Sequence, residues 1–347
     1  MGLALTGIIV AQGRPTAASA STAMSTRPSG IPWESLPWQG SLAPTCNTLT
    51  SAGDVSFLPG WYEFVNFDAN GYGGLFWLNV SGVHGSGVDS TYFQMHPWTS
   101  TKAGQVPTAQ WSTNDMALMR VGGSDDGNKR LVSLSGFTLR GTDQGHLYNG
   151  FMFYDAADGS TMTDCRVHGI PGRDSVPPGE TFGINVYRSN RVTLTRVEVD
   201  GRRPEDGTRV GAANVGVNYS SDFTMTDCYS HHTAYSHGVT CYEVKNVTLN
   251  RVRAEDCAAI GLNLERVSGV VNINGSTMLR CGWSHITVDS DRASAKVTIT
   301  DPIFDGPKLR VTVHASGYAG NPQKQLVSDI RLVVGGVSRP DLLQILT

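Results

Sequence analysis

The sequence predicts an all-β protein: a right-handed single-stranded parallel β-helix with a non-repetitive N-terminal arm and a C-terminal cap. Two observations predict this fold, a short apolar segment that recurs between Gly150 and about Gly306 and a second short strand that follows each copy. The six copies are GFMF (150–153), GINV (183–186), GVNY (216–219), GVTC (238–241), GLNL (261–264) and HITV (285–288). Their first residues lie 33, 33, 22, 23 and 24 positions apart, a period typical of coiled β-solenoids.

Aligning the copies places their apolar side chains in columns. The first column is Phe151, Ile184, Val217, Val239, Leu262 and Ile286, and the column two positions further on is Phe153, Val186, Tyr219, Cys241, Leu264 and Val288. Because side chains alternate along a strand, both columns are expected to point inward. The residues between them are expected on the outer face: Met152, Asn185, Asn218, Thr240, Asn263 and Thr287.

The second strand contributes one more apolar column. It consists of Leu134, Met162, Leu194, Met225, Leu249, Ile273 and Ile299. A column of like residues in every turn requires parallel coils in register, each about 4.8 Å above the last. The general chirality of parallel crossover connections predicts that these coils are right-handed.

The repeat divides the chain into three parts. Residues 1–50 lack it and are rich in Ala, Ser, Thr and Pro, so we expect an N-terminal arm or docking segment. Residues 51–306 form the parallel β-helix, with an irregular beginning and a Trp-rich excursion around Pro97–Trp111. Residues 307–347 lose the repeat again, and we expect them to cap an end whose unpaired backbone would otherwise invite association.

The composition argues against several classes of protein. A formal net charge of -3 argues against a general nucleic-acid surface. No stretch approaches a membrane span, and the apolar start has no basic residue before it, so we expect no membrane insertion and no secretory signal. The six cysteines show neither zinc-ligand nor disulfide spacing, so we expect buried, reduced thiols, no metal and no cofactor.

Two neighbouring coils carry extra residues at one corner. The distance from the second-strand column to the next copy is 21 residues after Met162 and 22 after Leu194, but only 13 after Met225. The two insertions, at 168–181 and 200–214, are therefore expected to stack into one wall, beside the shorter connection of the next coil. We call this region the loop corner.

The charged and aromatic residues of the loop corner suit a polysaccharide site. Acids can protonate or activate a sugar, cations bind acidic sugars, and aromatic rings stack on sugar rings. The candidate catalytic residues are Asp174, Glu180, Glu205 and Asp206. The candidate glycan-binding residues are Arg173, Arg202, Arg203, His231, His232, Tyr235 and His237. Any of them could instead be an ordinary solvated side chain.

Another group of charges shares one register of the repeat: Asp155, Arg188, Glu243 and Arg266. The simplest interpretation is an exposed charge ladder, in which each pair contributes little to stability.

Several motifs resemble a known family. FLPGWYEF (57–64) and NVSGVHGSGVDSTYF (79–93), followed by SLSGFTLRG (133–141) and the NxTLxxV rungs, are similar to the turns of pectate-lyase-like β-helix proteins of bacteriophage tails. The resemblance covers roughly residues 51–306. It implies a minor tail protein or tailspike-like receptor-binding protein of the virion, made in the host cytoplasm, homotrimeric, and docked on other tail proteins through residues 1–50.

The resemblance leaves two functions open. Ser236-His237-Gly238 is similar to the SHG element of polygalacturonases, but the NTD and paired-Asp elements that supply acid and base in that family are missing, so the match ends at His237. We favour a structural protein of the virion whose loop corner contacts host surface polysaccharide. The alternative is a tail-associated depolymerase, a glycoside hydrolase or lyase on the same scaffold.

Overall fold

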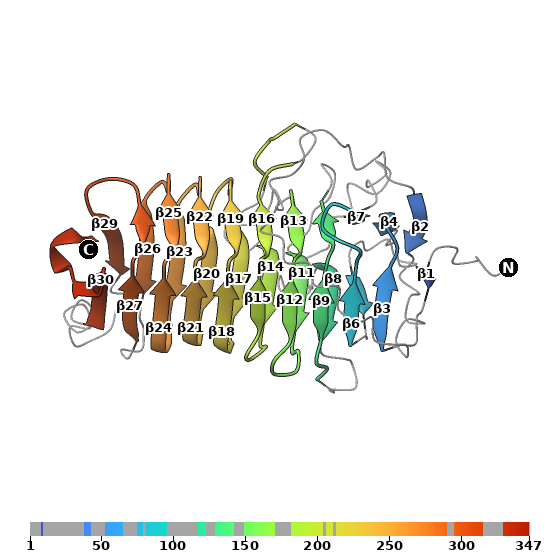
Figure 1. The fold of residues 1–347 in the computed structure, drawn as a ribbon, viewed down its shortest axis with the longest axis horizontal. Coiled ribbons are helices and arrows are strands. Elements are labelled where there is room, and N and C mark those ends of the chain that lie inside the picture. Colours follow the sequence, from blue (N-terminus) through green and yellow to red (C-terminus); the bar gives the residue numbers. More distant parts are fainter. Residues whose placement is uncertain are drawn as a thin grey trace, which may run out of the picture.

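Three sheets wind around one core and make the chain a parallel β-helix (Figure 1). The structure is a computed structural model that describes residues 8–9, 38–42, 53–64, 75–78, 81–95, 117–122, 129–141, 149–170, 182–203, 206–210, 213–289, 295–314 and 329–346. Strands of successive coils lie side by side along the long axis, with β3 (Asp54–Phe57) near one end and β30 (Ile330–Val334) near the other.

Each coil visits the sheets in the order A, B, C. Within the described residues, sheet A contains β1 (Ile8–Ile9), β3, β6 (Gly82–His84), β9 (Ser133–Ser135), β12 (Thr161–Thr163), β15 (Thr193–Thr195), β18 (Ser221–Thr226), β21 (Lys245–Asn250), β24 (Ser268–Asn274), β27 (Lys296–Thr300), β30 and β31 (Val337–Ser338). Sheet B contains β2 (Trp38–Leu42), β4 (Gly60–Phe64), β7 (Thr91–Met95), β10 (Thr138–Arg140), β13 (Arg166–His168), β16 (Glu198–Asp200), β19 (Tyr229–His231), β22 (Arg253–Glu255), β25 (Thr277–Leu279) and β28 (Ile303–Phe304). Sheet C contains β5 (Leu75–Leu78), β8 (Ala117–Gly122), β11 (Asn149–Tyr154), β14 (Phe182–Tyr187), β17 (Ala213–Asn218), β20 (Val239–Tyr242), β23 (Ile260–Glu265), β26 (Ser284–Asp289), β29 (Leu309–His314) and β32 (Leu343–Leu346).

The apolar column of the second strand forms the core side of sheet A, as predicted. Leu134, Met162, Leu194, Met225, Leu249, Ile273 and Ile299 pair in register from coil to coil, and all are buried. Sheet C adds Phe151, Phe153, Ile184 and Val186 to the same core. Since burying one such side chain contributes about 1.5–3 kcal/mol, the stacked columns are the main source of the stability of the coil.

The predicted second strand is in fact two strands in each coil. Thr161–Thr163 belongs to sheet A and Arg166–His168 to sheet B, and the chain bends between them at Asp164, which has a φ of 53°. Arg196, Asp227 and Arg251 have similar positive φ values at the same bend of the next coils. The apolar alternation shifts by one residue at this bend, from Met162 to Cys165 and from Leu194 to Val197, so reading the segment as one continuous strand misses the third sheet.

The predicted register of one copy is wrong by two residues. Ile184 pairs with Val215 and Val186 with Val217, so Asn214 occupies the place of the leading glycine and Tyr219 lies beyond the inward column. Tyr219 is 46% exposed. Asn214 is accommodated there because its side-chain amide donates to the carbonyls of Val199 and His231, at 2.9 and 2.7 Å.

Gly216, which suggested the wrong register, is small for another reason. A Cβ atom at this position would lie 2.5 Å from the ring of Phe182 in the preceding coil. The glycine therefore makes room for an aromatic ring and does not mark the beginning of a repeat.

The residues between the inward columns of sheet C are not solvent-exposed, contrary to the expectation of an outer, solvent-facing column. Met152, Asn185 and Thr287 are buried. Asn218 donates to the side-chain oxygen of Asn185 at 2.8 Å, so neighbouring coils satisfy part of each other's polar groups. Coils only about 4.8 Å apart shield short side chains from water, which the alternation of side chains alone does not predict.

The described ends of the chain extend the same sheets. Trp38–Leu42 pairs in parallel with Gly60–Phe64, and Ile8–Ile9 pairs antiparallel with β3. At the other end β32 extends sheet C, preceded by a 3₁₀ helix at Pro340–Leu342. The rest of the predicted arm and the excursion at Pro97–Trp111 lie outside the described residues.

Two further expectations concern the described residues. Their five cysteines, Cys165, Cys228, Cys241, Cys257 and Cys281, are free and buried, as predicted. In this part of the chain no helix is long and apolar enough to cross a bilayer.

Candidate functional site

The loop corner lies where sheet B passes into sheet C. The connection from β16 to β17 runs from Gly201 to Ala212, whereas the one from β22 to β23 contains only residues 256–259. The long connections therefore occur in neighbouring coils at one corner, as the spacing predicted. The first of them, residues 171–181, lies outside the described residues, and with it the candidates Arg173, Asp174 and Glu180; Glu205 in the second lies outside them as well.

Beside these connections, the outer face of sheet B carries two columns of polar residues in register. Arg166, Glu198, Tyr229 and Arg253 form one column. His168, Asp200, His231 and Glu255 form the other. Asp200, His231 and Glu255 are buried although they belong to the outer face. Buried charged groups need charged or hydrogen-bonding partners, so the side chains of these two columns contact one another.

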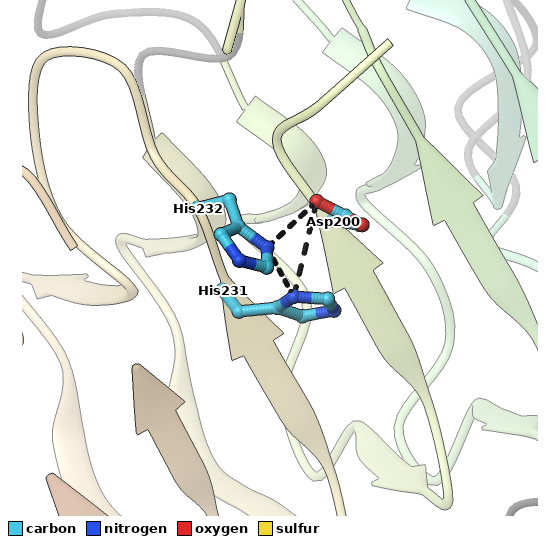
Figure 2. A group of neighbouring side chains, drawn as sticks. All are labelled: Asp200, His231 and His232. Carbon is cyan, nitrogen blue, oxygen red and sulfur yellow. Dashed lines mark hydrogen bonds and ion pairs between the residues drawn. The ribbon is translucent and has the colours of Figure 1, made fainter. Parts of the chain in front are cut away.

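Asp200, His231 and His232 converge at the end of β16 and β19 (Figure 2). The Nδ1 atoms of the two histidines lie 2.5 Å apart. The Oδ1 atom of Asp200 lies 3.2 Å from Nδ1 of His232 and 3.8 Å from Nδ1 of His231. Burial and the neighbouring His231 lower the pKa of His232.

A second layer of charges supports this group. Arg166 donates to Glu198 at 2.6 Å and to Asp89 at 2.8 Å, and His231 Nε2 donates to Glu198 at 3.1 Å. Burial opposes ionisation of Glu198, but the hydrogen bond from His231 and the charge of Arg166 outweigh it and lower its pKa to about 2. Burial lowers the pKa of His168 to about 4.

The arginines predicted to bind glycan are occupied within their own loop. Arg202 forms a bidentate pair with Asp200, and its Nη2 atom lies 2.9 Å from Oδ2. Arg203 donates to Asp206 at 2.7 Å. Asp206, a candidate catalytic acid, has a lowered pKa because it accepts hydrogen bonds from Thr208 and lies beside Arg203.

The two remaining candidates differ in exposure. Tyr235 is 63% exposed. His237 is largely buried, its Nδ1 atom has no hydrogen-bond partner among the described residues, and burial lowers its pKa to about 4.

A second surface, which the sequence did not single out, lies where sheet C passes back into sheet A. Tyr154, Tyr187, Tyr219 and Tyr242 come from four consecutive coils, and we call them the tyrosine row. Their ring centroids are 5.4, 5.6 and 5.4 Å apart in that order. Asn218 occupies the column position between Tyr187 and Tyr242, and Tyr219, with a φ of 52°, places its ring in the gap.

Two members of the row, Tyr187 and Tyr219, line an open hollow of about 450 Å³. Its walls are Lys129, Asp155, Tyr187, Arg188, Asn190 and Tyr219. Arg188 lies 3.5 Å from Asp155, and further along Arg266 lies 2.9 Å from Glu243, so the predicted charge ladder borders the row. In the observed register Asn218 pairs with Tyr187, which pairs with Tyr154. Tyr219, the residue after Asn218, therefore occupies the same position in its coil as the charge-ladder residues Asp155 and Arg188 do in theirs.

Residues 149–324, just over half of the chain, match the family described as right handed beta helix region. The chain belongs to this family. The right-handed coil predicted from the chirality of crossovers is thereby confirmed. No curated protein matches the chain in sequence.

Several solved structures share this right-handed β-helix. The catalytic unit of a GH87 alpha-1,3-glucanase from Streptomyces thermodiastaticus is 15% identical, with a TM-score of 0.48 over 82% of this chain and 59% of that one. Tailspike protein 2 of the Escherichia coli bacteriophage CAB120 is 11% identical, with a TM-score of 0.41 over 86% and 44%. Pectate lyase C from Erwinia chrysanthemi is 15% identical, with a TM-score of 0.40 over 86% and 74%. The chain thus spans less than two thirds of the first two, and at such identities the likeness concerns the coil and not its chemistry.

Proposed function

We propose that this protein is a structural component of a bacteriophage tail that binds host cell-surface glycan through the tyrosine row. The tail assignment rests on the resemblance of the FLPGWYEF and NVSGVHGSGVDSTYF turns to tail β-helix proteins. The proposal includes a homotrimer, attachment to other tail proteins through residues 1–50, and a virion location after synthesis in the host cytoplasm.

The observation that carries glycan binding is the continuous row of four rings beside a hollow with charged and amide walls. Aromatic rings offer an apolar face to a sugar, while Asn190, Arg188 and Lys129 supply hydrogen-bond donors at the rim. A row repeated from coil to coil suits a chain of sugar units better than a single small molecule.

Binding is favoured over cleavage by the state of the carboxyl groups at the loop corner. Within the described residues, Glu198, Asp200, Asp206 and Asp256 all have lowered pKa values, so each is ionised at neutral pH. A glycosidase needs a general acid whose pKa is raised, so that it carries a proton to the leaving oxygen. A glycosidase at this corner would therefore have to take its general acid from the remaining candidates Asp174, Glu180 and Glu205.

The experiment measures binding of the purified chain to immobilised capsular and O-antigen polysaccharides from a panel of bacteria. Tyr187→Ala and Tyr219→Ala are each expected to lower the affinity about five- to tenfold, because each removes one stacking face. Tyr219→Phe keeps the ring and should retain most of the affinity. Trp283→Ala is the matched control, since Trp283 is 71% exposed but lies outside the row.

Four results would each contradict the proposal or part of it. Unchanged affinity in both tyrosine variants would rule out the row as the binding surface. Absence of the chain from purified virions, measured by mass spectrometry, would rule out the tail assignment. New reducing or unsaturated ends after incubation with the bound polysaccharide would establish the depolymerase instead, and a monomer by light scattering would exclude the trimer.

A further inference from the structure

Three potential metal-ligating atoms converge at the loop corner, one each from Asp200, His231 and His232. The Nδ1 atoms of His231 and His232 face one another at 2.5 Å, and Oδ1 of Asp200 lies 3.2 and 3.8 Å from them (Figure 2). The three distances bracket the separation of about 3.4 Å expected between ligands bound to one ion at 2.0–2.1 Å in a tetrahedral arrangement.

Both imidazole rings have a carboxylate behind them. Nε2 of His231 lies 3.1 Å from Glu198, and Nε2 of His232 lies 3.7 Å from Asp256. A ring whose Nε2–H points at a carboxylate presents a lone pair at Nδ1, which is the arrangement that ligating histidines adopt in metal sites. At 2.5 Å the two Nδ1 atoms must share either a proton or a metal ion, because two facing lone pairs would repel each other.

The backbone brings both rings to one side of the chain. Consecutive residues of a strand point to opposite faces. His232 instead has a φ of 58°, at the bend where β19 ends, which turns its side chain toward that of His231. Asp200 pairs with His231 across β16 and β19, so the third ligand is held in register by the sheet. The arrangement is thus fixed by main-chain hydrogen bonds and does not depend on a loop.

We propose that Asp200, His231 and His232 form a binding site for one divalent transition-metal ion, with Zn²⁺ the best match to two imidazoles and a carboxylate. Three protein ligands leave the fourth position of a tetrahedral ion to water. Arg202 donates to both oxygens of Asp200, to Oδ2 from Nη2 at 2.9 Å and to Oδ1 from its backbone N–H at 3.0 Å, and Oδ1 is the oxygen that faces the two Nδ1 atoms. Glu198 and Asp256 act as the carboxylates that orient the rings.

The test uses the untagged full chain, freed of metal with a chelator and titrated with Zn²⁺ in a calorimeter. One ion per chain is expected to bind. His232→Asn and Asp200→Asn should each lower the affinity about tenfold or more, and Glu198→Gln should lower it less than the ligand changes do. Asn is chosen for position 232 because it tolerates a positive φ, so this variant is expected to fold. His237→Asn, at the same corner but outside the group, is the matched control and should bind as the unchanged chain does.

Co²⁺ provides a readout that a merely structural cluster would not give. The visible absorption of Co²⁺ bound by nitrogen and oxygen in four-coordinate geometry should appear on the unchanged chain and disappear in His232→Asn. The proposal would be overturned if Zn²⁺, Ni²⁺ and Co²⁺ all failed to bind saturably. It would also be overturned if His232→Asn and Asp200→Asn bound the ion as tightly as the unchanged chain does. A thiolate charge-transfer band would place the ion on cysteine and overturn it too.

Discussion

The loop corner and the tyrosine row flank the same strands of sheet C, yet they use their polar groups in opposite ways. At the loop corner Arg166, Arg202 and Arg203 are all paired with carboxylates of the chain itself. At the row, Tyr219 is nearly half exposed and the hollow beside it is open. The comparison teaches that a dense group of charges need not be a glycan-binding surface, because guanidinium and carboxylate groups that pair with one another have fewer hydrogen-bonding atoms to offer a sugar.

The largest loss of stability is expected from a change in the buried core of the coil, which holds both the loop corner and the tyrosine row in place. Leu249→Asp places a charge in the stacked column of sheet A, where Leu249 is fully buried. Because an unpaired buried charge costs more than the stability of a typical domain can offset, the variant should fail to fold and lose both surfaces together. Circular dichroism and soluble yield test this. A folded variant that keeps either surface would show that the two do not depend on one coil.

A smaller loss is expected when the loop corner alone is disturbed. Arg166→Met removes the guanidinium that donates to Glu198 and Asp89, and since the Arg166 side chain is only 6% exposed, the free energy of unfolding should fall by about 3 kcal/mol. Urea unfolding measures this change. Glycan binding by the tyrosine row should persist in the folded fraction.

Arg251→Met is the matched control for that variant. Arg251 pairs with Asp227 at 2.6 Å, but its side chain is 62% exposed, so its loss should change the free energy of unfolding far less than Arg166→Met does. Equal losses in the two variants would contradict the distinction between buried and exposed pairs at these corners.

A further effect is a dependence of stability on pH that originates at His237 of the loop corner. The pKa of His237 is about 4 in the folded chain and about 6.5 when unfolded, so between these values the unfolded chain binds more protons. Stability is therefore complete above about pH 6.5 and falls by up to about 3 kcal/mol as the pH approaches 4. His237→Asn should remove this part of the slope in urea unfolding measured across the window. A variant with the same slope as the unchanged chain would mean that other groups, such as His168, account for it.

The sequence by itself determined the coil. The column from Leu134 to Ile299 could be predicted because parallel stacking places like residues above one another, and that requirement leaves a period in the sequence. The long connections at one corner were predictable for the same reason, since extra residues interrupt a constant spacing. The register of Asn214 was not predictable, because a side-chain amide can take the place of a glycine. The bend at Asp164 leaves only a one-residue shift in the apolar alternation, from Met162 to Cys165, which the interpretation as one strand missed.

Only the tertiary structure decided which side chains meet. His231 and His232 are neighbours in sequence that a strand would point apart, and the positive φ of His232 brings them together beside Asp200. Tyr219 joins the tyrosine row because it follows Asn218 at a corner, a relation visible only once the coils are in register. Both sites depend on contacts between residues 23 to 33 positions apart. The local pattern around each residue carries no trace of those contacts, because they arise from how the coils stack.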